Sequence, residues 1–515
     1  MTEYSNGPVL FACHWALAEL SEQPRLSPDH LKKVTCIGQV SAGQILQVLE
    51  EGAERVILLG CSTNRCRHQT GPNIAESQVR LLQRLTTTLG LGSESVKLLL
   101  TDQPETKALL ASFANKKKPQ RRKARSARMP SSHESKAQPP EPELLRLCQD
   151  CGRCSGICPV SRTGLGFSPR RLIQTSIQSG SDALSNDRAL FACLGCDLCA
   201  LVCPSEIRLS TLMPELRRQN PPGALPATPA HAGLPHTLMR LMARSPVPQN
   251  RLSWLDQSCE TSPQGDTLLF VGCVPYFEPI FESLHVSPLT TVRNTIRLLN
   301  RANIRPVLLP DERCCGHDLN WLGDTENFLR LAEQNLSQIR ASGARRVVFL
   351  CPECQRTFQL DYNRHFGPLE FETWHITQLL AQELNITFAP MKLRVTYHDP
   401  CRLGRHLGIY EPPRSLLRSV PELEFVEMAR NRTQATCCGG TAWVECGAAA
   451  KLLQAERLAE ASATGARLLI TACSKCNIHF SCALEGDSRN SIKLRHIVDF
   501  LAESAGLAEN LQERR

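Results

Sequence analysis

The chain has 515 residues, of which 25 are cysteine, and a formal net charge of +9. This length allows several domains with ordinary hydrophobic cores. Much of the positive charge lies in one short stretch, KKKPQRRKARSAR at 116–128, and metal-bound thiolates would offset part of the rest. The charge balance therefore gives no support to a nucleic-acid-binding protein, and we expect no nucleic-acid partner.

The start of the chain and its hydropathy bear on where the protein works. The first residues, MTEYSNGPVLF, lack the basic and apolar segments of a secretory signal peptide. No apolar run approaches the roughly 20 residues that cross a bilayer. We therefore expect a cytoplasmic protein with no transmembrane segment. In that compartment thiols stay reduced, and grouped cysteines indicate metal clusters rather than disulfides.

Residues 1–112 predict a first α/β domain. The stretches KVTCIG (33–38) and RVILLG (55–60) are aliphatic and end in glycine, which is typical of short buried strands. Between them we expect a helix from its N-cap, Ser41, to Gly52, and after them a second helix from about Asn73 to Leu89.

Four cysteines fall in this domain: Cys13, Cys36, Cys61 and Cys66. Two of them, Cys36 and Cys61, lie in or directly after an expected strand. From the residues alone, a cluster site and buried small side chains both remain open. The stretches FACHW, VTCIGQVSAGQILQVLEEGAERVILLGC and CRHQTGPNIAESQVRLLQRL resemble the delta subunit of methyl-viologen-reducing hydrogenase. That resemblance implies one [2Fe–2S] cluster on the four cysteines, although the family commonly has a further cysteine where this chain has Ala16.

Residues 113–142 are rich in Lys, Arg, Ser, Pro and Gln and have almost no aliphatic side chains. Such a segment buries too little surface to offset its ordering entropy, so we expect a basic flexible linker. A basic nucleic-acid-binding arm is less well supported, because no aromatic residues are interleaved for stacking on bases.

Residues 143–258 carry the strongest local motif, a repeated C-x2-C-x2-C-x3-C-P, and then a connector. The fourth cysteine of each copy is too displaced to close its own cluster, and in two-cluster ferredoxins it ligates the other one. We therefore predict one cubane [4Fe–4S] cluster on Cys148, Cys151, Cys154 and Cys203, and a second on Cys193, Cys196, Cys199 and Cys158. Zinc is disfavoured by the third cysteine and the trailing Cys-Pro. The segment resembles the mostly helical dicluster ferredoxin of heterodisulfide reductases and succinate dehydrogenases.

Two repeats follow, at 259–386 and 387–515, and each contains a lone cysteine, a Cys-Cys-Gly and a C-x2-C. In each, a strand delivers the lone cysteine, a helix ends at Gly343 or Gly465, and a second strand carries the C-x2-C. This layout places thiols at the edge of a parallel sheet. Gly316 and Gly439 are expected to adopt positive φ or to allow close approach to metal and sulfur atoms.

The repeats resemble the cysteine-rich CCG domains of heterodisulfide reductase catalytic subunits and of the iron–sulfur subunits of glycolate and lactate oxidases. In heterodisulfide reductases each repeat holds a non-cubane [4Fe–4S] cluster, and a disulfide is cleaved between the two. By that resemblance, one set of catalytic ligands is Cys273, Cys314, Cys315, Cys351 and Cys354, and the other is Cys401, Cys437, Cys438, Cys473 and Cys476.

Several other residues near these motifs could have roles. His317 directly follows Cys-Cys-Gly and could donate a proton to a leaving thiolate, or could simply hold a turn. For Arg402, Arg405 and His406, a solvated helix start is favoured over contact with an acidic substrate. Three cysteines lie outside the pattern and are expected to pack in the protein interior: Cys259, Cys446 and Cys482.

No G-x-G-x-x-G after a strand and no P-loop are found, so a flavin-containing protein or a hydrogenase is expected to supply electrons. The leading hypothesis is a heterodisulfide-reductase-like subunit that reduces a disulfide. The alternative is an electron-transfer subunit of a glycolate- or lactate-type flavin dehydrogenase that delivers electrons to a quinone. A zinc-bearing scaffold is a third, weaker interpretation.

Overall fold

The computed structural model describes residues 7–20, 29–106, 108, 145–184, 187, 189–220, 229–244, 246–383, 385–440, 442–486 and 491–508. The expected linker, 113–142, lies outside the described residues. The chain divides into two compact units, one of Met1–Glu134 with Ala230–Arg251 and one of Ser135–Pro229 with Leu252–Arg515. Within the described residues, no helix combines the length and the apolar character that spanning a bilayer requires.

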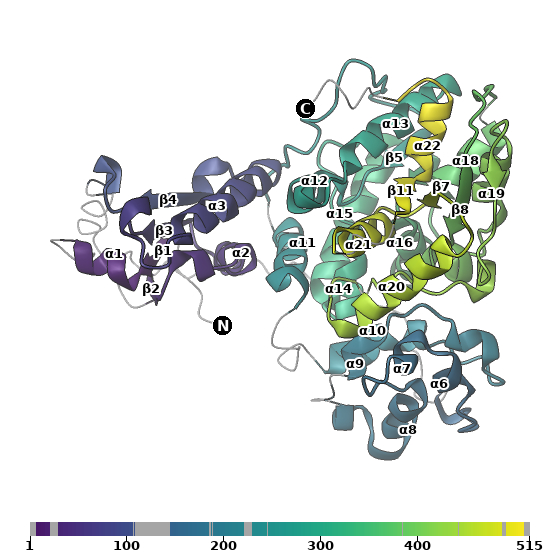
Figure 1. Ribbon diagram of the computed structural model, residues 1–515, viewed down its shortest axis with the longest axis horizontal. Helices are drawn as coiled ribbons and strands as arrows, with labels where there is room; N and C mark the ends of the chain where they lie inside the picture. The colour runs from purple at the N-terminus through teal and green to yellow at the C-terminus, as the bar shows by residue number, and fades with distance from the viewer. Residues whose placement is uncertain are drawn as a thin grey trace. The chain divides into compact units, whose positions relative to one another are not determined.

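The first unit is built on a four-stranded parallel sheet in the order β2-β1-β3-β4 (Figure 1). Its elements are β1 (Pro8–Cys13), α1 (His14–Glu19), β2 (Leu31–Val34), α2 (Ala42–Glu50), β3 (Arg55–Gly60), α3 (Gly71–Thr88) and β4 (Val96–Leu100). Ser41 caps α2 as expected, in a capping box with Gln44. The strand expected at 33–38 is instead Leu31–Val34, because the chain turns through Ile37–Gln39 after it. Helix α3 begins at Gly71, two residues before the expected Asn73, since Pro72 favours the first helical turn.

The connector does not form one body with the ferredoxin region that precedes it. Helix α11 (Leu234–Arg244) packs on α2, and the segment Ala230–Arg251 belongs to the first unit. The interval 143–258, which the sequence treats as one region, is therefore divided between the two units.

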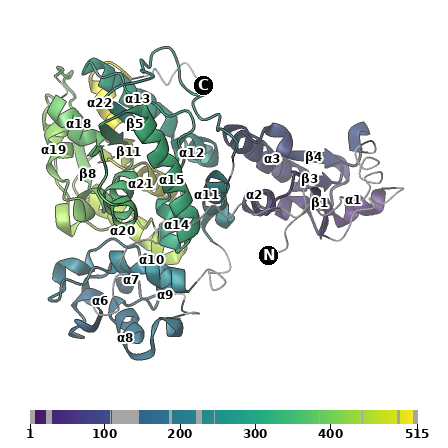
Figure 2. The same ribbon diagram turned by 180° about the vertical axis from the view of Figure 1, so that it is seen from behind.

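The ferredoxin region consists of short helices and turns, as expected. They are α6 (Arg153–Ile157), α7 (Pro159–Arg162), α8 (Pro169–Ser179), α9 (Ala189–Ala192), a turn at Cys199–Val202 and α10 (Leu209–Gln219). Helix α10 packs against the first repeat and α7 against the second (Figures 1 and 2). The buried Arg217 on α10 ties these parts together, because it donates hydrogen bonds to the carbonyl oxygens of Trp321 (2.7 Å) and Cys193 (2.9 Å).

The first repeat contains a three-stranded parallel sheet in the order β5-β6-β7. Its strands are β5 (Thr267–Phe270), β6 (Arg346–Phe349) and β7 (Glu372–His375). Its helices are α12 (Val274–Ile280), α13 (Pro288–Arg301), α14 (His317–Leu322), α15 (Thr325–Ser342), α16 (Pro352–Arg356), a π-helical turn (Thr357–Tyr362), α17 (Asn363–Phe366) and α18 (Ile376–Glu383). Helix α15 ends at the expected Gly343, which has a φ of 71°.

The second repeat has the parallel sheet order β11-β10-β8-β9. Its strands are β8 (Arg394–His398), β9 (Glu424–Phe425), β10 (Leu468–Thr471) and β11 (Lys493–His496), and its helices are a π-helical turn (Arg402–His406), α19 (Glu411–Arg418), α20 (Ala448–Ser462), α21 (Ser474–Glu485) and α22 (Ile497–Ser504). Helix α20 ends at Ser462, three residues before Gly465. The three strands β8, β10 and β11 correspond to β5, β6 and β7, so the sequence repeat is also a structural one.

The two repeats share one hydrophobic core. Helix α13 of the first packs on α22 of the second, and α18 packs on α19. Buried side chains from both, such as Ile296 and Phe500, belong to the same cluster. Asp499 also accepts hydrogen bonds from Thr291 (2.7 Å) and Asn294 (2.8 Å) across the junction. This packing holds the cysteine-bearing strand ends of both repeats in a fixed relation.

Candidate iron–sulfur centres

The four N-terminal cysteines lie at one end of the parallel sheet. Cys13 ends β1, and Cys36 and Cys61 follow β2 and β3. The thiols of Cys13 and Cys61 are 3.6 Å apart, and those of Cys36 and Cys66 form a second hydrogen-bonded pair. Burial is the main reason that the pKa of Cys61 is raised to about 12, and the hydrogen bond with Cys13 is the second. The grouping fits a cluster site, since binding iron would remove the cost of crowding four protonated thiols.

Gly71 explains how the loop after Cys66 can close over this group. A Cβ atom at this position would lie 2.5 Å from the Cys36 sulfur and 3.1 Å from the Cys66 sulfur. Any larger residue at the start of α3 would therefore push the two thiols apart.

The ferredoxin cysteines surround two separate cavities. One is lined by Cys158, Cys193, Cys196 and Cys199 together with apolar side chains such as Phe167. The other is lined by Cys148, Cys151, Cys154 and Cys203, and Cys199 lines both cavities. Each cavity thus contains the crossed set of four thiols that the spacing predicts for one cubane, and we propose these sets as the ligands.

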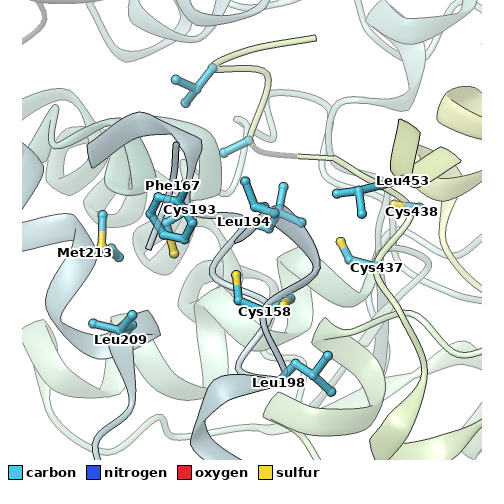
Figure 3. Close-up of a cluster of buried hydrophobic side chains, with 14 of the residues drawn as sticks. Cys158, Phe167, Cys193, Leu194, Leu198, Leu209, Met213, Cys437, Cys438 and Leu453 are labelled. Atoms are coloured by element: carbon cyan, nitrogen blue, oxygen red, sulfur yellow. The ribbon is translucent and has the colours of Figure 1, made fainter. Parts of the chain in front are cut away.

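The two cavities differ in their exposure. Burial raises the pKa of Cys193 to about 12, whereas Cys151 in the other set is exposed. Figure 3 shows the buried set, with Cys158 and Cys193 on the ferredoxin side and Cys437 and Cys438 of the second repeat nearby.

The five cysteines of the first repeat converge where the chain leaves β5 and β6. Cys273 follows β5, the pair Cys314-Cys315 precedes α14, and Cys351 and Cys354 flank the start of α16. The thiol of Cys273 donates to that of Cys314 at 2.9 Å, and Cys315 and Cys354 form another thiol hydrogen bond. Gly316 has the expected positive φ of 79°.

The second repeat has the same arrangement with its own five cysteines. The thiol of Cys476 donates to that of Cys438 at 3.2 Å, and Cys401 is hydrogen-bonded to Cys437. Gly439 has a φ of 80°, matching Gly316. The structure therefore brings each predicted set of five thiols together, and we propose each set as the ligands of one cluster.

The two five-cysteine sets meet. The thiol of Cys351 in the first repeat is hydrogen-bonded to that of Cys473 in the second, and each is the first cysteine of its C-x2-C. The second set also faces the ferredoxin region, because Cys401 lies close enough to raise the pKa of Cys196, and Cys196 lies close enough to raise the pKa of Cys437. The thiols thus form a continuous series from the ferredoxin cavities into the paired repeats.

A buried ionic group lies at the same junction. Glu353 and Lys475 occupy the third position of the two C-x2-C motifs, and their side chains form an ion pair of 2.6 Å. Lys475 also contacts Asp318 at 2.5 Å. Burial raises the pKa of Glu353 to about 7. This group was not expected from the sequence, although aligning CPEC with CSKC would have placed an acid opposite a base.

His317 is buried beside this ionic group. Its Nδ1 lies 3.0 Å from the Thr357 hydroxyl, and its Nε2 is 3.6 Å from Glu353. Burial, and then the charges of Arg402 and Lys475, hold the pKa of His317 well below its usual range. The imidazole is therefore neutral at neutral pH, and its role as a proton donor stays a prediction.

His398 lies beside the second set. Its ring can place a nitrogen within 4.8 Å of the sulfur atoms of Cys438 and Cys476. Its Nδ1 accepts a hydrogen bond of 3.1 Å from Arg457, which fixes the ring.

The expectation of a solvated helix start at 402–406 is wrong. Arg402 is buried and donates to the carbonyl oxygens of Gly195 and Leu194, while Arg405 donates to that of Cys196 at 2.6 Å. His406 lies 2.9 Å from the Gly195 oxygen. These side chains meet the loop of the buried ferredoxin set because unpaired carbonyl groups there require donors.

The three cysteines outside the pattern are partly or fully buried. Cys259 packs in the core shared by the repeats, as expected. Cys446 and Cys482 are half-buried near Lys451, whose Nζ lies 3.1 Å from the Cys482 sulfur.

Comparison with known families agrees with this division of the chain. The cysteine-rich domain model, CCG, matches residues 267–359 and 395–481. The methyl-viologen-reducing hydrogenase delta subunit model matches residues 9–118, and the 4Fe-4S dicluster domain model matches residues 143–207.

Curated relatives cover most of the chain. A subunit of the dihydromethanophenazine:CoB–CoM heterodisulfide reductase of Methanosarcina barkeri is 29% identical over 406 residues, which is 71% of this chain and 95% of that protein. The same subunit of the enzyme from Methanosarcina acetivorans is 28% identical, covering 71% of this chain and 96% of that protein. A subunit of the fumarate reductase (CoM/CoB) of Methanothermobacter marburgensis is 27% identical, covering 69% of this chain and 72% of that protein.

The thiol sets, the three matching domain families and these relatives agree with one another. The chain is a heterodisulfide-reductase-like iron–sulfur oxidoreductase that carries two CCG domains, a 4Fe-4S dicluster domain and a hydrogenase delta-subunit domain.

Proposed function

We propose that this protein reduces a disulfide at the junction of its two cysteine-rich repeats, with electrons received from a redox partner. The reaction consumes one disulfide, two electrons and two protons and releases two thiols. The names of the relatives point to a CoB–CoM type of disulfide as the substrate class. The partner is a flavin-containing electron-transfer subunit or a hydrogenase, which would meet the N-terminal domain.

The observation that carries this proposal is the contact between Cys351 and Cys473. It brings two complete five-cysteine sets to one place, where two cluster sites could act on the same sulfur–sulfur bond. A relay could use two such sites in series, but their contact at equivalent cysteines also suits joint action on one disulfide.

The order of the thiol sets supports an electron path through the larger unit. The set with the exposed Cys151 lies at the surface and can exchange electrons with another redox centre, whereas the set with Cys193 is buried. The buried set borders Cys401 and Cys437 of the second repeat, and the second repeat borders the first.

We propose one [2Fe–2S] cluster on the N-terminal set, two cubane [4Fe–4S] clusters on the ferredoxin sets and two non-cubane [4Fe–4S] clusters on the repeats. When bound, such clusters exchange electrons one at a time. The side chains of the chain bury the sites, hold the thiols in sets and exclude water. Asp318, Glu353 and Lys475 fix the junction electrostatically beside the place where thiols would be released.

The proposal is tested with the purified protein under anaerobic conditions. Iron analysis should give about 18 iron atoms per chain, and a few irons together with zinc would contradict the cluster assignment. After reduction, addition of a CoB–CoM disulfide or a small organic disulfide should change the electron paramagnetic resonance spectrum of the clusters. Reoxidation by a quinone, with no response to any disulfide, would favour a relay to quinone instead.

A further inference from the structure

A cavity of about 570 Å³ lies between the ferredoxin region and the first repeat, within the larger unit. One wall comes from α10 and the residues just before it, and the other from α14, α15 and the segment from Arg356 to His365. His406 also borders it. The volume is typical of a pocket for a small molecule.

The charge of the lining is strongly biased. Four arginines border the cavity, Arg208, Arg218, Arg356 and Arg364, against only two carboxylates, Glu215 and Asp361. Arg218 lies 2.5 Å from Glu215, and Arg356 is paired with Asp361. Both carboxylates are thus engaged by an arginine, and the lining keeps an excess of two positive charges.

Two residues of the lining have a buried nitrogen atom without a hydrogen-bond partner among the described residues. These atoms are the Nε atom of Arg356, which is a donor, and the Nδ1 atom of His365, which donates or accepts according to its tautomer. Within the same part of the chain, no carboxylate pairs with Arg208, which is exposed at the N-terminal end of α10. The exposed guanidinium groups of Arg208 and Arg364, on a wall with two more arginines than carboxylates, therefore offer donors to an acidic acceptor from outside the chain.

One neighbouring polar side chain suits the same kind of ligand. Asn320 lines the cavity and can donate from its amide group. The hydroxyl groups of Ser210 and Thr211 already donate to Asp197 and to the Arg208 carbonyl oxygen, so they can only accept. Arginine is well matched to the planar, bidentate recognition of oxyanions. We propose that this cavity binds a small molecule through a phosphate, sulfonate or carboxylate group.

The test is anaerobic titration calorimetry of the complete iron–sulfur protein with inorganic pyrophosphate and, separately, phosphate. The double variant R208Q/R364Q removes two exposed arginines of the lining. The variant R340Q/R345Q removes the same charge from exposed sites outside the cavity and serves as the matched control. The dissociation constant for pyrophosphate should rise by about tenfold or more in R208Q/R364Q and by no more than about twofold in the control.

Absence of saturable binding to the unaltered protein, or equal weakening in both variants, would overturn the proposal. Iron content and circular dichroism show whether R208Q/R364Q folds. If that double variant does not fold, the dissociation constants of the single variants R208Q and R345Q are compared in the same way. Calorimetry does not depend on turnover, so its failure would leave the proposed reaction standing.

Two sources share the proposed ligand chemistry, and a kinetic measurement separates them. If the anion is the charged end of a disulfide substrate, pyrophosphate should compete with that substrate and raise its KM. If the anion is a separate ligand, KM should stay constant while pyrophosphate still binds.

Discussion

The two cysteine-rich repeats have the same scaffold but different surroundings. Both place five thiols at the ends of equivalent parallel strands, and both use a glycine with φ near 80° after the cysteine pair. The second repeat, however, faces the ferredoxin loop through Arg402 and Arg405. The first repeat instead presents His317, Asp318 and Glu353. Equivalent cysteine sets can therefore have different positions in one electron path, with the second repeat next to the ferredoxin region and the first repeat beyond it.

The largest expected effect is a difference between the two repeats on loss of a cysteine. C437S and C314S should each lose about four iron atoms and abolish disulfide reduction. In C437S the first-repeat site should also no longer receive electrons from the ferredoxin region, because the second set lies between them. In C314S the second-repeat site should still be reduced. Iron analysis and electron paramagnetic resonance check both statements.

The matched control for these variants is C259S, which changes a buried cysteine outside both sets. It should keep its full iron content. If C314S and C437S prove indistinguishable in every signal, the two repeats are equivalent and the proposed order is wrong.

The next effect concerns the equivalent positions Glu353 and Lys475. Replacing Lys475 with Met leaves the buried Asp318 and the partly buried Glu353 without their cation, so the free energy of unfolding should fall by about 3–5 kcal/mol. Chemical denaturation measures the loss. K392M, at an exposed lysine just before β8, is the control and should change stability by no more than about 0.5 kcal/mol.

Neutralising both acids in the K475M background should restore part of the stability. A triple variant, D318N/E353Q/K475M, that is no more stable than K475M would show that the loss comes from packing of the lysine stem and not from unpaired charge.

A smaller effect is expected at the contact between the second repeat and the ferredoxin loop. R405Q removes a charged donor to the Cys196 carbonyl oxygen. A hydrogen bond of this kind contributes about 1.5–3 kcal/mol to the free energy of unfolding. Iron content should be retained, but electron transfer from the ferredoxin region into the repeats should slow, as followed by rapid-mixing absorbance. R418Q, at an exposed arginine of α19, should leave the rate unchanged. Loss of iron in R405Q would show a ligand-supporting role instead.

The smallest effect concerns a feature in which the repeats agree. His375 and His496 end the equivalent strands β7 and β11, and burial lowers their pKa values to about 4 and about 3. An unfolded histidine takes up a proton near pH 6.5, whereas these stay neutral, so stability should fall as the pH drops below about 6.5. The slope is about 1.4 kcal/mol per pH unit for each histidine.

The double variant H375N/H496N keeps an acceptor at each helix start but cannot titrate. It should flatten the dependence of unfolding free energy on pH between about 6.5 and 4. An unchanged slope would mean that other buried groups dominate the acid sensitivity.

Much of this organisation could be predicted from the sequence because cysteine spacing constrains geometry strongly. The crossed ferredoxin sets and the five-thiol sets join cysteines far apart in the chain, but each motif occurs twice with nearly the same spacing, and the cysteines of the repeats follow expected parallel strands. The α/β fold class of the first domain and the repeats is confirmed, although the strand β1 was not anticipated despite its apolar stretch PVLFAC.

Contacts between distant segments could not be predicted in the same way. Arg405 and Cys196 are separated by 209 positions, and Lys475 and Asp318 by 157. Each such pair depends on how the repeats and the ferredoxin region dock, which local periodicity does not encode. The same reason explains why Arg402 and Arg405 were expected in solvent.

The most direct test of the proposed reaction counts thiols. The protein is reduced with a limiting, known number of electrons, the excess reductant is removed, and a CoB–CoM or small organic disulfide is added without oxygen. Release of two thiols for every two electrons lost from the protein, abolished in C437S and retained in C259S, is the predicted result. Loss of electrons without thiol release, or thiol release that persists in C437S, would contradict disulfide reduction at the paired repeats.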